Sequence, residues 1–229
     1  MARTPVAAGT ARRTPNPRGQ GGRLRDELLD AASGLLAAGG RDAELTLRSV
    51  ARAAGVAAPS VYQHFADLDE LMLALVRHHL ADLATAIGNA LLPVRTRPAA
   101  EQLRVMGHAY VRWGLDHPGP YTVVFEGKVL RHLTREQEAA LLAGTDLFEQ
   151  LITVTAAVSQ ASDPELAATA IWTSLHGVVA LRIAKPAYPW PELDQHVDAV
   201  LSSAWRAATP APASRRPDPP QPPGSPRTR

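Results

Sequence analysis

The strongest constraint in this 229-residue sequence is a series of apolar stripes at helical spacing, separated by prolines and glycines. The first stripe comprises four residues three or four positions apart, Leu24, Leu28, Ala31 and Leu35. Such spacing lines one face of an α-helix. The main β-branched cluster, residues 121–125, is short and has no hairpin turn beside it, so strands are not expected. The sequence therefore predicts an all-α fold.

Residues that start and stop helices stand at the ends of these stripes. Thr46 precedes the second stripe as an N-cap, and Gly55 follows it as a stop signal. Asp67 and Glu70 form a carboxylate variant of the capping box, which predicts a long helix running toward Pro93.

Similar signals recur in the second half of the chain. Thr134 and Gln137 form a regular capping box, and Asp163-Pro164 puts a proline at a first helical position. Prolines expected to lie between helices, as breakers, are Pro93, Pro118, Pro120 and those of residues 186–191.

Both ends of the chain are poor in large apolar residues. Residues 1–22 mix arginine, proline and glycine, and residues 207–229 contain eight prolines. Neither segment can bury enough apolar surface to offset the entropy lost on ordering, so both are expected to be disordered. Residues 1–25 carry six arginines, whereas residues 26–206 have a net charge of −7, so any polyanion contact must be local. The arginines serve either solubility or nucleic-acid binding, and both interpretations stay open.

The composition also argues against several classes of protein. The absence of cysteine excludes disulfides and thiolate zinc sites, and it suits a cytoplasmic protein. Neither a membrane span of roughly 18 apolar residues nor a secretory signal is expected. Familiar nucleotide, hydrolase and zinc-protease motifs are absent, so no catalytic residue, cofactor or metal site is expected. His78 and His79 are adjacent, which predicts that they point to different sides of one helix, share no metal and are solvated.

Residues 46–65, TLRSVARAAGVAAPSVYQHF, predict two short helices joined by a turn. The second helix is expected from about Pro59 to His64. Ala51 is small where the two helices approach each other, and Gly55 can adopt the left-handed backbone of the turn. The pattern predicts a helix-turn-helix, whose second helix enters the major groove of DNA. An ordinary helical hairpin is the alternative.

Residues 23–75 resemble the N-terminal domain of the tetracycline-repressor (TetR) family of transcriptional regulators. The resemblance rests on residues 45–56 (LTLRSVARAAGV), on the element Tyr62-Gln-His-Phe65, and on Leu71 in the next helix. It implies a DNA-binding head over residues 23–75 and a ligand-binding and dimerisation body over residues 76–206.

Residue by residue, the resemblance implies a DNA surface made of Arg48, Ala57, Ala58, Pro59, Ser60, Tyr62, Gln63 and His64. Arg48 would reach the groove or a phosphate, and Tyr62 and His64 would hydrogen-bond phosphates. Gln63 could bond an adenine, and the alanines offer methyl groups suited to a thymine methyl. His64 has a second interpretation as a buried histidine, and Phe65 is expected in the core.

Leu68 departs from the family pattern, because many members carry a lysine there that grips a phosphate. The start of its helix could still present backbone N–H groups to that phosphate. Residues 23–66 hold five basic and five acidic residues, so the head is neutral. The arginine-rich segment before it is therefore a candidate for neutralising DNA phosphates.

Nine of the eleven aromatic residues lie within residues 76–206. A mixture of rings and a few polar tips on apolar helices is typical of a small-molecule pocket. The residues expected to line it are His108, Trp113, Tyr121, Phe125, Trp172 and His176. For each of them, simple core packing is the alternative.

The segment Trp172-Thr-Ser-Leu-His176-Gly177 resembles the Trp-His-Gly (WHG) signature of one subclass of family C-terminal domains. The family resemblance further implies a homodimer through helices near residues 164–184 and 191–206, although a single packed core would use the same residues. Together these features predict a repressor that binds a pseudo-palindromic operator in double-stranded DNA and is released by a small-molecule effector of unknown identity. An all-α adaptor whose helix-turn-helix no longer binds DNA is the alternative.

Overall fold

The computed structural model describes residues 21–39, 45–125, 136, 141, 146–158 and 163–208. Every regular element in these ranges is helical, so the predicted all-α fold is confirmed. The elements are α1 (Gly21–Gly39), α2 (Leu47–Ala53), α3 (Ala58–Tyr62), α4 (Leu68–Leu91), the 3-10 helix η2 (Leu92–Val94), α5 (Ala99–Asp116), α6 (Pro118–Phe125), α8 (Leu147–Val158), α9 (Pro164–Ala184) and α10 (Leu193–Ala208).

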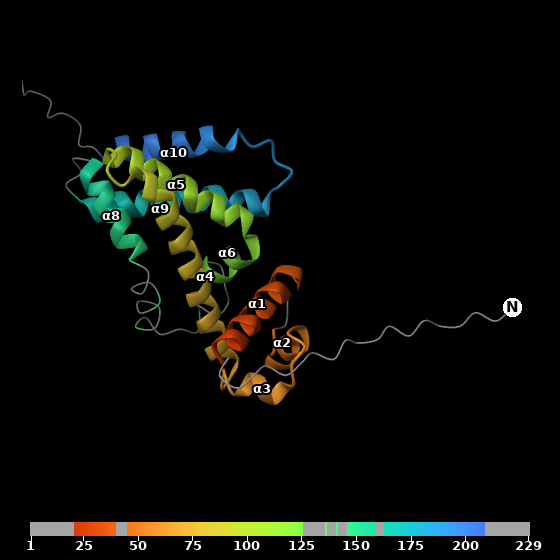
Figure 1. Ribbon diagram of the computed structural model, residues 1–229. Helices are drawn as coiled ribbons and strands as arrows, with labels where there is room; N and C mark the ends of the chain where they lie inside the picture. The colour runs from red at the N-terminus through yellow and green to blue at the C-terminus, as the bar shows by residue number, and fades with distance from the viewer. Residues whose placement is uncertain are drawn as a thin grey trace, which may run out of the picture.

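The molecule consists of a head and a body joined by one long helix (Figure 1). Helices α1, α2 and α3 pack together in the head, whereas α5, α8, α9 and α10 pack together in the body. Helix α4 starts in the head, where it contacts α1, and continues into the body, where it contacts α5. Helix α6 lies at the junction and contacts α1, α4 and α5. Head and body therefore meet along α4 and α6.

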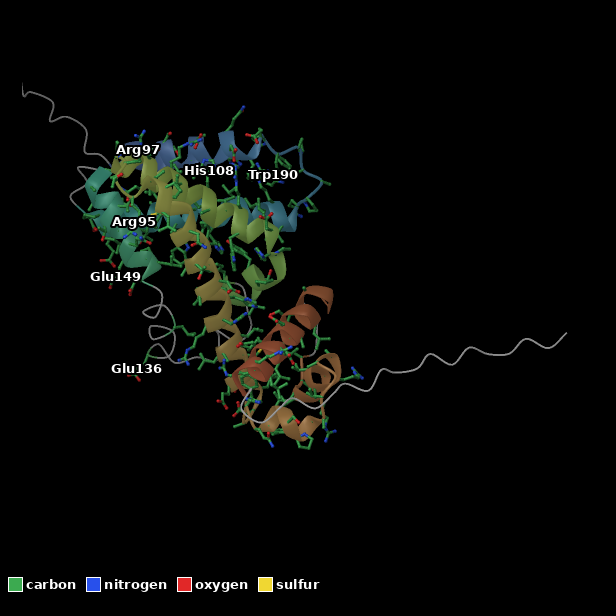
Figure 2. All side chains as sticks on the ribbon, in the orientation of Figure 1. Arg95, Arg97, His108, Glu136, Glu149 and Trp190 are labelled. Carbon is green, nitrogen blue, oxygen red and sulfur yellow. The ribbon has the colours of Figure 1, made fainter. Side chains whose placement is uncertain are left out.

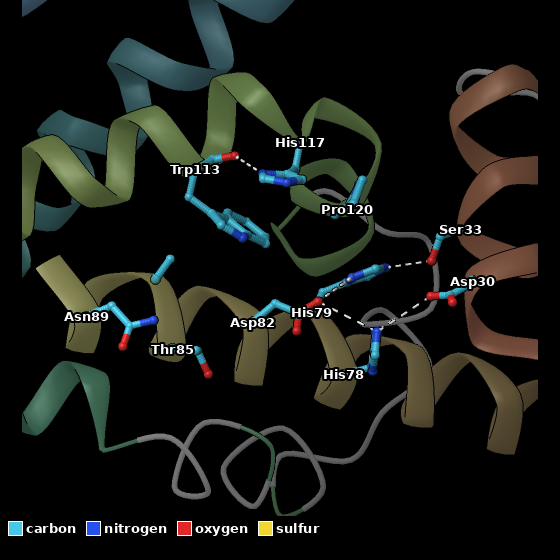
Figure 3. A pocket seen from close by; sticks show the side chains of 11 residues that line it. Asp30, Ser33, His78, His79, Asp82, Thr85, Asn89, Trp113, His117 and Pro120 are labelled. Atoms are coloured by element: carbon cyan, nitrogen blue, oxygen red, sulfur yellow. Dashed lines mark hydrogen bonds and ion pairs between the residues drawn. The ribbon is translucent and has the colours of Figure 1, made fainter. Parts of the chain in front are cut away.

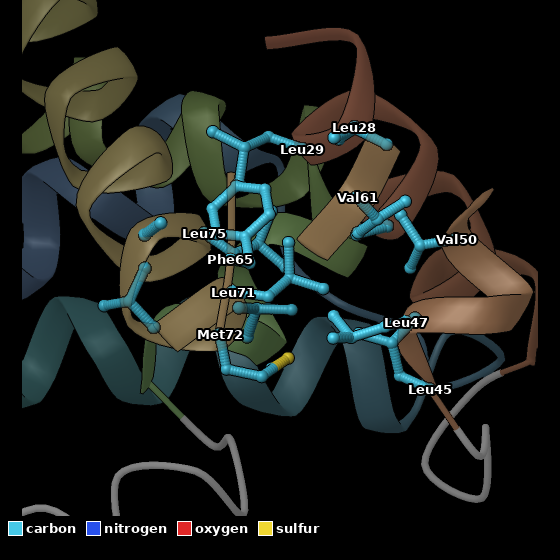
Figure 4. Close-up of a cluster of buried hydrophobic side chains, with 14 of the residues drawn as sticks. Leu28, Leu29, Leu45, Leu47, Val50, Val61, Phe65, Leu71, Met72 and Leu75 are labelled. Atoms are coloured by element: carbon cyan, nitrogen blue, oxygen red, sulfur yellow. The ribbon is translucent and has the colours of Figure 1, made fainter. Parts of the chain in front are cut away.

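The core of the head forms beneath α2 and α3 (Figure 4). Val50 of α2 and Val61 of α3 are fully buried, and they pack into one cluster with Leu28 and Leu71. Phe65 is 1% exposed, which confirms its expected place in the core. Burial of this apolar underside stabilises the packing of α2 and α3 on the head core, and the opposite side of the two helices remains exposed to solvent.

The turn between α2 and α3 follows the expected signals. Thr46 and Ser49 cap α2 reciprocally, since each side-chain oxygen accepts the other residue's backbone N–H at 3.0 Å. Gly55 has a φ of +67°, the left-handed conformation that glycine adopts without a steric penalty. The sequence therefore specifies where α2 begins and where it ends.

Helix α3 is shorter than expected, because it covers Ala58–Tyr62 instead of reaching His64. The carbonyl of Val61 accepts hydrogen bonds from the backbone N–H groups of His64, at 2.9 Å, and Phe65, at 3.0 Å. This arrangement ends the helix two residues before the expected position. Gln63 and His64 consequently lie in the bend that leads to α4.

Pro118 and Pro120 were expected between helices, but both lie in the first turn of α6. Proline is tolerated there because its missing N–H would have no partner within the helix. The β-branched segment 121–125 completes the same helix. The predicted capping box of Thr134 and Gln137 lies outside the described residues.

In the body, a glycine allows helix α5 to pack closely against its neighbours. A Cβ atom on Gly114 of α5 would lie 2.7 Å from Val179 Cγ1 and 2.9 Å from Tyr121 Cδ2, so glycine allows α5 to approach both α9 and α6.

Within the described part of the chain, α9 alone is long and apolar enough to cross a membrane, by length and composition only. One third of that apolar stretch (33%) is buried in the protein.

Candidate nucleic-acid interface and effector site

The residues implied to contact DNA lie on the outer side of the helix-turn-helix. Tyr62 is 53% exposed, which is unusual for so large a ring. The other exposed members are Arg48, Ala57, Pro59 and Gln63, and the half-buried ones are Ala58, Ser60 and His64. The shared apolar underside accounts for this division, because it leaves the opposite side of α2 and α3 in solvent.

A cleft of about 480 Å³ opens beside this surface, between α2, the end of α3 and the start of α4. Its lining residues are Thr46, Leu47, Arg48, Tyr62, Ala66, Asp67 and Leu68. Arg48 and Tyr62 come from different helices and meet here. A guanidinium and a phenol hydroxyl are both hydrogen-bond donors, so the cleft offers two groups suited to a DNA phosphate.

The start of α4 is less free to bind a phosphate than the sequence alone indicates. Asp67 Oδ1 accepts the backbone N–H of Glu70 at 2.8 Å, and Glu70 Oε2 accepts the backbone N–H of Ala66 at 2.7 Å. Two carboxylates therefore stand at this helix end. Leu68 is half-buried and packs against the head core, which explains its apolar character.

In the body, the structure brings together four of the residues expected to bind an effector. Tyr121 Oη and His176 Nδ1 lie 2.5 Å apart and their rings stack at a centroid distance of 5.3 Å. Phe125 lies 4.8 Å from the Tyr121 ring and 6.4 Å from the Trp172 ring. This aromatic cluster joins α6 to α9.

Tyr110 completes the polar centre of the aromatic cluster. Its hydroxyl lies 3.4 Å from both the Tyr121 hydroxyl and His176 Nδ1. Burial raises the pKa of Tyr110 to about 12, so its phenol stays protonated and can donate at neutral pH. The cluster thus offers aromatic faces and a few polar tips, which is a combination suited to a planar or amphipathic ligand.

His108 lies apart from the aromatic cluster, between α5 and α10 (Figure 2). Its Nε2 is 2.7 Å from Asp198 Oδ1 and its Nδ1 is 3.2 Å from Asp194 Oδ1. Arg104 binds Asp198 with two hydrogen bonds of 2.7 and 2.9 Å, and Arg112 binds Asp194 at 2.9 and 3.0 Å. Hydrogen bonds from Arg104 and His108 lower the pKa of Asp198 to about 2. We call these five residues the α5–α10 network.

Trp113 also lies apart from the aromatic cluster, because it is buried on the side of α5 that faces the head. Its ring stacks on His117 at a centroid distance of 5.5 Å, and His117 Nδ1 lies 2.9 Å from the Trp113 carbonyl oxygen. Both residues line a cavity of about 470 Å³ between α1, α4, α5 and α6 (Figure 3). Head and body both contribute walls to this cavity.

The expectation that His78 and His79 point to different sides of α4 is wrong, and so is the expectation that His79 is solvated. His79 is only 4% exposed, and its Nε2 lies 2.9 Å from Ser33 Oγ of α1. Both rings reach one carboxylate, since Asp82 Oδ2 lies 3.6 Å from His78 Nε2 and 3.8 Å from His79 Nδ1 (Figure 3). Burial, together with the neighbouring charge of His78, lowers the pKa of His79 to about 4. Adjacent positions differ by about 100° around a helix, but packing of α1 across α4 and flexible side chains bring the two rings to one place.

A helix-turn-helix head with an exposed outer side, carried on a larger helical body, defines a class: DNA-binding transcriptional regulators with a separate sensing domain. Residues 28–75 match the N-terminal domain of bacterial regulatory proteins of the tetR family. Residues 103–221 match the tetracyclin repressor-like C-terminal domain. The chain therefore belongs to the TetR family.

One curated protein matches a part of this chain, and solved structures share its fold. The chain is 48% identical over 54 residues to an uncharacterized HTH-type transcriptional regulator of Haemophilus influenzae, which is 24% of this chain and 26% of the relative. It thus spans about a quarter of that curated relative's length. A protein of unknown function from Rhodococcus sp. RHA1 has a similar fold, with a TM-score of 0.68 and 24% identity, over 85% of this chain and 100% of the other. A TetR-like transcriptional regulator from the same organism gives a TM-score of 0.64 and 21% identity, over 85% and 98%.

Proposed function

We propose that this regulator is a repressor, which binds a pseudo-palindromic operator as a homodimer and is released by a small-molecule effector. The observation that carries the proposal is the cleft at the tip of the head, where Arg48 and Tyr62 converge from two helices. Two such heads on a symmetric dimer would contact DNA about one helical turn apart, at roughly 34–36 Å. The protein would act on DNA in the cytoplasm.

The proposed dimer uses the exposed side of α9 together with α10. Leu166 and Leu181, near opposite ends of α9, are 66% and 53% exposed although their helix is strongly apolar. A Cβ atom on Gly177, between them, would meet nothing within 4 Å, so this side of the helix leaves room for another backbone. We attribute the unburied apolar surface of α9 to packing against a second copy, and not to a membrane.

The proposed effector site is the aromatic cluster, and helix α6 supports a route from it to the head. Tyr121 and Phe125 of α6 belong to the cluster, while α6 itself packs on α1. A Cβ atom on Gly119 would lie 2.9 Å from the Cβ of Ala37, which shows how closely α6 and α1 approach. A ligand that pushed the Tyr121 ring toward α6 would press α6 against α1, which would couple the two sites.

Mobility-shift titration of the full chain, with DNA from upstream of its own and neighbouring genes, tests the proposal. Arg48→Ala should weaken operator binding by about 1–3 kcal/mol if Arg48 reaches a base edge. Tyr62→Phe should weaken binding to all sequences alike, because a phosphate contact carries no sequence information. Arg97→Ala is a matched control, since Arg97 is exposed at the end of the body away from α3 (Figure 2).

Two outcomes would contradict the proposal. A folded dimer that shifts no fragment at about 50 mM salt would favour the adaptor alternative, since low salt strengthens phosphate contacts. Wild-type affinity in both head variants would remove Arg48 and Tyr62 from the interface. Residues 1–20 of the arginine-rich segment lie outside the described residues, and the contribution of this segment to DNA binding stays a prediction.

A further inference from the structure

We propose that Asp30, His78, His79 and Asp82 form a binding site for a divalent transition-metal ion of the zinc type, which links α1 of the head to α4. The four residues line the cavity between head and body (Figure 3). The site is separate from the aromatic cluster and from the DNA-binding surface. Metal binding as such does not depend on the proposed function; only its effect on DNA does.

The spacing of the donor atoms is the first argument. His78 Nε2 lies 3.6 Å from Asp82 Oδ2 and 3.9 Å from Asp30 Oδ1, and His79 Nδ1 lies 3.8 Å from Asp82 Oδ2. These separations are too long for hydrogen bonds. Zinc binds such ligands at about 2.0–2.2 Å, so the donor atoms of a tetrahedral site lie about 3.3–3.6 Å apart. Shifts of a few tenths of an ångström would bring each of these three pairs to that spacing, whereas the three α4 donor atoms, which lie within 4.8 Å of one another, would have to approach by up to about 1 Å to share an ion.

The α4 ligands are also close to one another as a set. One donor atom from each of His78, His79 and Asp82 lies within 4.8 Å of the other two. Asp30 approaches from α1 and supplies a fourth oxygen. Two imidazoles and two carboxylates are a ligand set that zinc and neighbouring divalent ions accept.

The hydrogen bonding of Ser33 fixes which nitrogen of His79 is free. Ser33 has one hydroxyl proton, which it donates to the carbonyl oxygen of Leu29 at 2.9 Å. Its oxygen can then only accept a hydrogen bond from His79 Nε2–H, at 2.9 Å. The lone pair of His79 is left on Nδ1, the atom that faces Asp82. An imidazole oriented by a hydrogen bond on its other nitrogen is typical of metal ligands.

The surrounding charge favours a cation. Asp30 and Asp82 bring two carboxylates to the cavity, and the described residues that line it include neither lysine nor arginine. The alternative is that His78 merely forms weak ion pairs with the two aspartates, without any metal.

A bound ion would tie α1 to α4 through Asp30. Since α1 belongs to the DNA-binding head and α4 continues into the body, the ion would restrict how the head moves relative to the body. Occupancy should then change operator affinity, a consequence that rests on the proposed function.

Titration of tag-free full chain, stripped with a chelator, with Co²⁺ and then Zn²⁺ tests the proposal. Co²⁺ should bind with 1:1 stoichiometry and give visible d–d absorption, which Zn²⁺ then displaces. Asp82→Asn and His78→Ala should each weaken binding at least about tenfold. Asp69→Asn, an exposed carboxylate change on the same helix, should leave it unchanged. Asp82 is 54% exposed, so its amide variant should fold, and circular dichroism checks that it does.

Absence of a 1:1 cobalt complex, or equal affinity in wild type and Asp82→Asn, would overturn the proposal and favour the plain ion pairs. A second arm uses Asp30→Asn, which keeps the α4 ligands but removes the one from α1. This variant should bind Co²⁺ more weakly and lose any zinc effect on the DNA mobility shift. Metal binding is measured without DNA, so failure to bind metal leaves the regulator proposal standing, and failure to shift DNA leaves the metal result standing.

Discussion

Two histidines in this protein each lie between two aspartates, yet their surroundings differ. In the α5–α10 network, His108 has nitrogen–oxygen distances of 2.7 and 3.2 Å to Asp198 and Asp194. At the junction of head and body, His78 lies 3.6 and 3.9 Å from Asp82 and Asp30. His108 is hydrogen-bonded directly to both of its aspartates, whereas the nitrogen of His78 lies too far from both of its aspartates for a hydrogen bond.

The two clusters also differ in whether arginine side chains balance the charges of their aspartates. Arg104 and Arg112 each bind one aspartate of the α5–α10 network, so its acidic charge is matched by neighbouring guanidinium groups. No lysine or arginine is found among the described residues lining the junction cavity. A histidine between two aspartates therefore does not by itself indicate an ion site. The nitrogen–oxygen distances and the presence or absence of neighbouring guanidinium groups distinguish a structural hydrogen-bond network from a candidate ion site.

The largest expected effect is a zinc-dependent gain in thermal stability. At a free Zn²⁺ concentration of 100 times the Kd, binding to the folded state alone stabilises it by about 2.7 kcal/mol. For a chain of this size, that corresponds to a rise in Tm of roughly 5–11 °C. Differential scanning calorimetry of the stripped protein with and without Zn²⁺ measures it.

The two clusters should respond differently in that experiment. At the same free Zn²⁺ concentration, Asp82→Asn should reduce the zinc-dependent rise in Tm to about half or less, whereas Asp198→Asn should retain it. A rise that disappears in Asp198→Asn instead would place the ion in the α5–α10 network and reverse the roles of the two clusters.

A smaller effect is expected in the metal-free protein. Asp198→Asn removes the shared partner of Arg104 and His108 and should lower the free energy of unfolding by at most about 1 kcal/mol, since the network is largely exposed. Asp82→Asn should change it by less than about 0.5 kcal/mol, because no short hydrogen bond is lost. Urea unfolding of both variants at neutral pH checks this, and a larger loss in Asp82→Asn would argue that the junction pairs matter structurally.

The smallest expected effect is on the free energy of unfolding at low pH. The pKa of Asp198 is about 2 in the folded protein against a usual value of 3.8, so the unfolded chain takes up its proton first as the pH falls. Its stabilising contribution is therefore present above about pH 4 and is lost as the pH falls toward 2. Wild type should exceed Asp198→Asn in unfolding free energy at pH 6 and lose that advantage near pH 2. An advantage that persists there would contradict the assignment.

Sequence reasoning succeeded where the signal is local. Thr46, Gly55 and Asp67 act on backbone groups a few positions away, so their effects can be predicted without knowing the fold. The helical stripes likewise identified residues of the head core such as Leu28, and Phe65 was expected there although it belongs to no stripe. The same locality explains the error at Pro118 and Pro120, because first-turn prolines and helix-breaking prolines look alike in sequence.

Contacts between distant segments could not be predicted in this way. His108 meets Asp198 across 90 positions, and His79 meets Ser33 across 46. The adjacency of His78 and His79 indicated only that their side chains leave the helix in different directions, and nothing in the sequence showed that α1 would cross there. Composition grouped His108 and Trp113 with the aromatic cluster, although each lies on a different side of α5.

Helix α4 is a single rod of 24 residues, about 36 Å long, that runs from the cleft beside Arg48 and Tyr62 into the body. A rod of that length acts as a lever, so a tilt of about 5° at its body end displaces its other end by about 3 Å. In a symmetric pair the displacement would occur twice. In the proposed dimer, side-chain adjustments in the body no larger than the repacking of one ring would therefore be enough to change the separation of the two copies of α3.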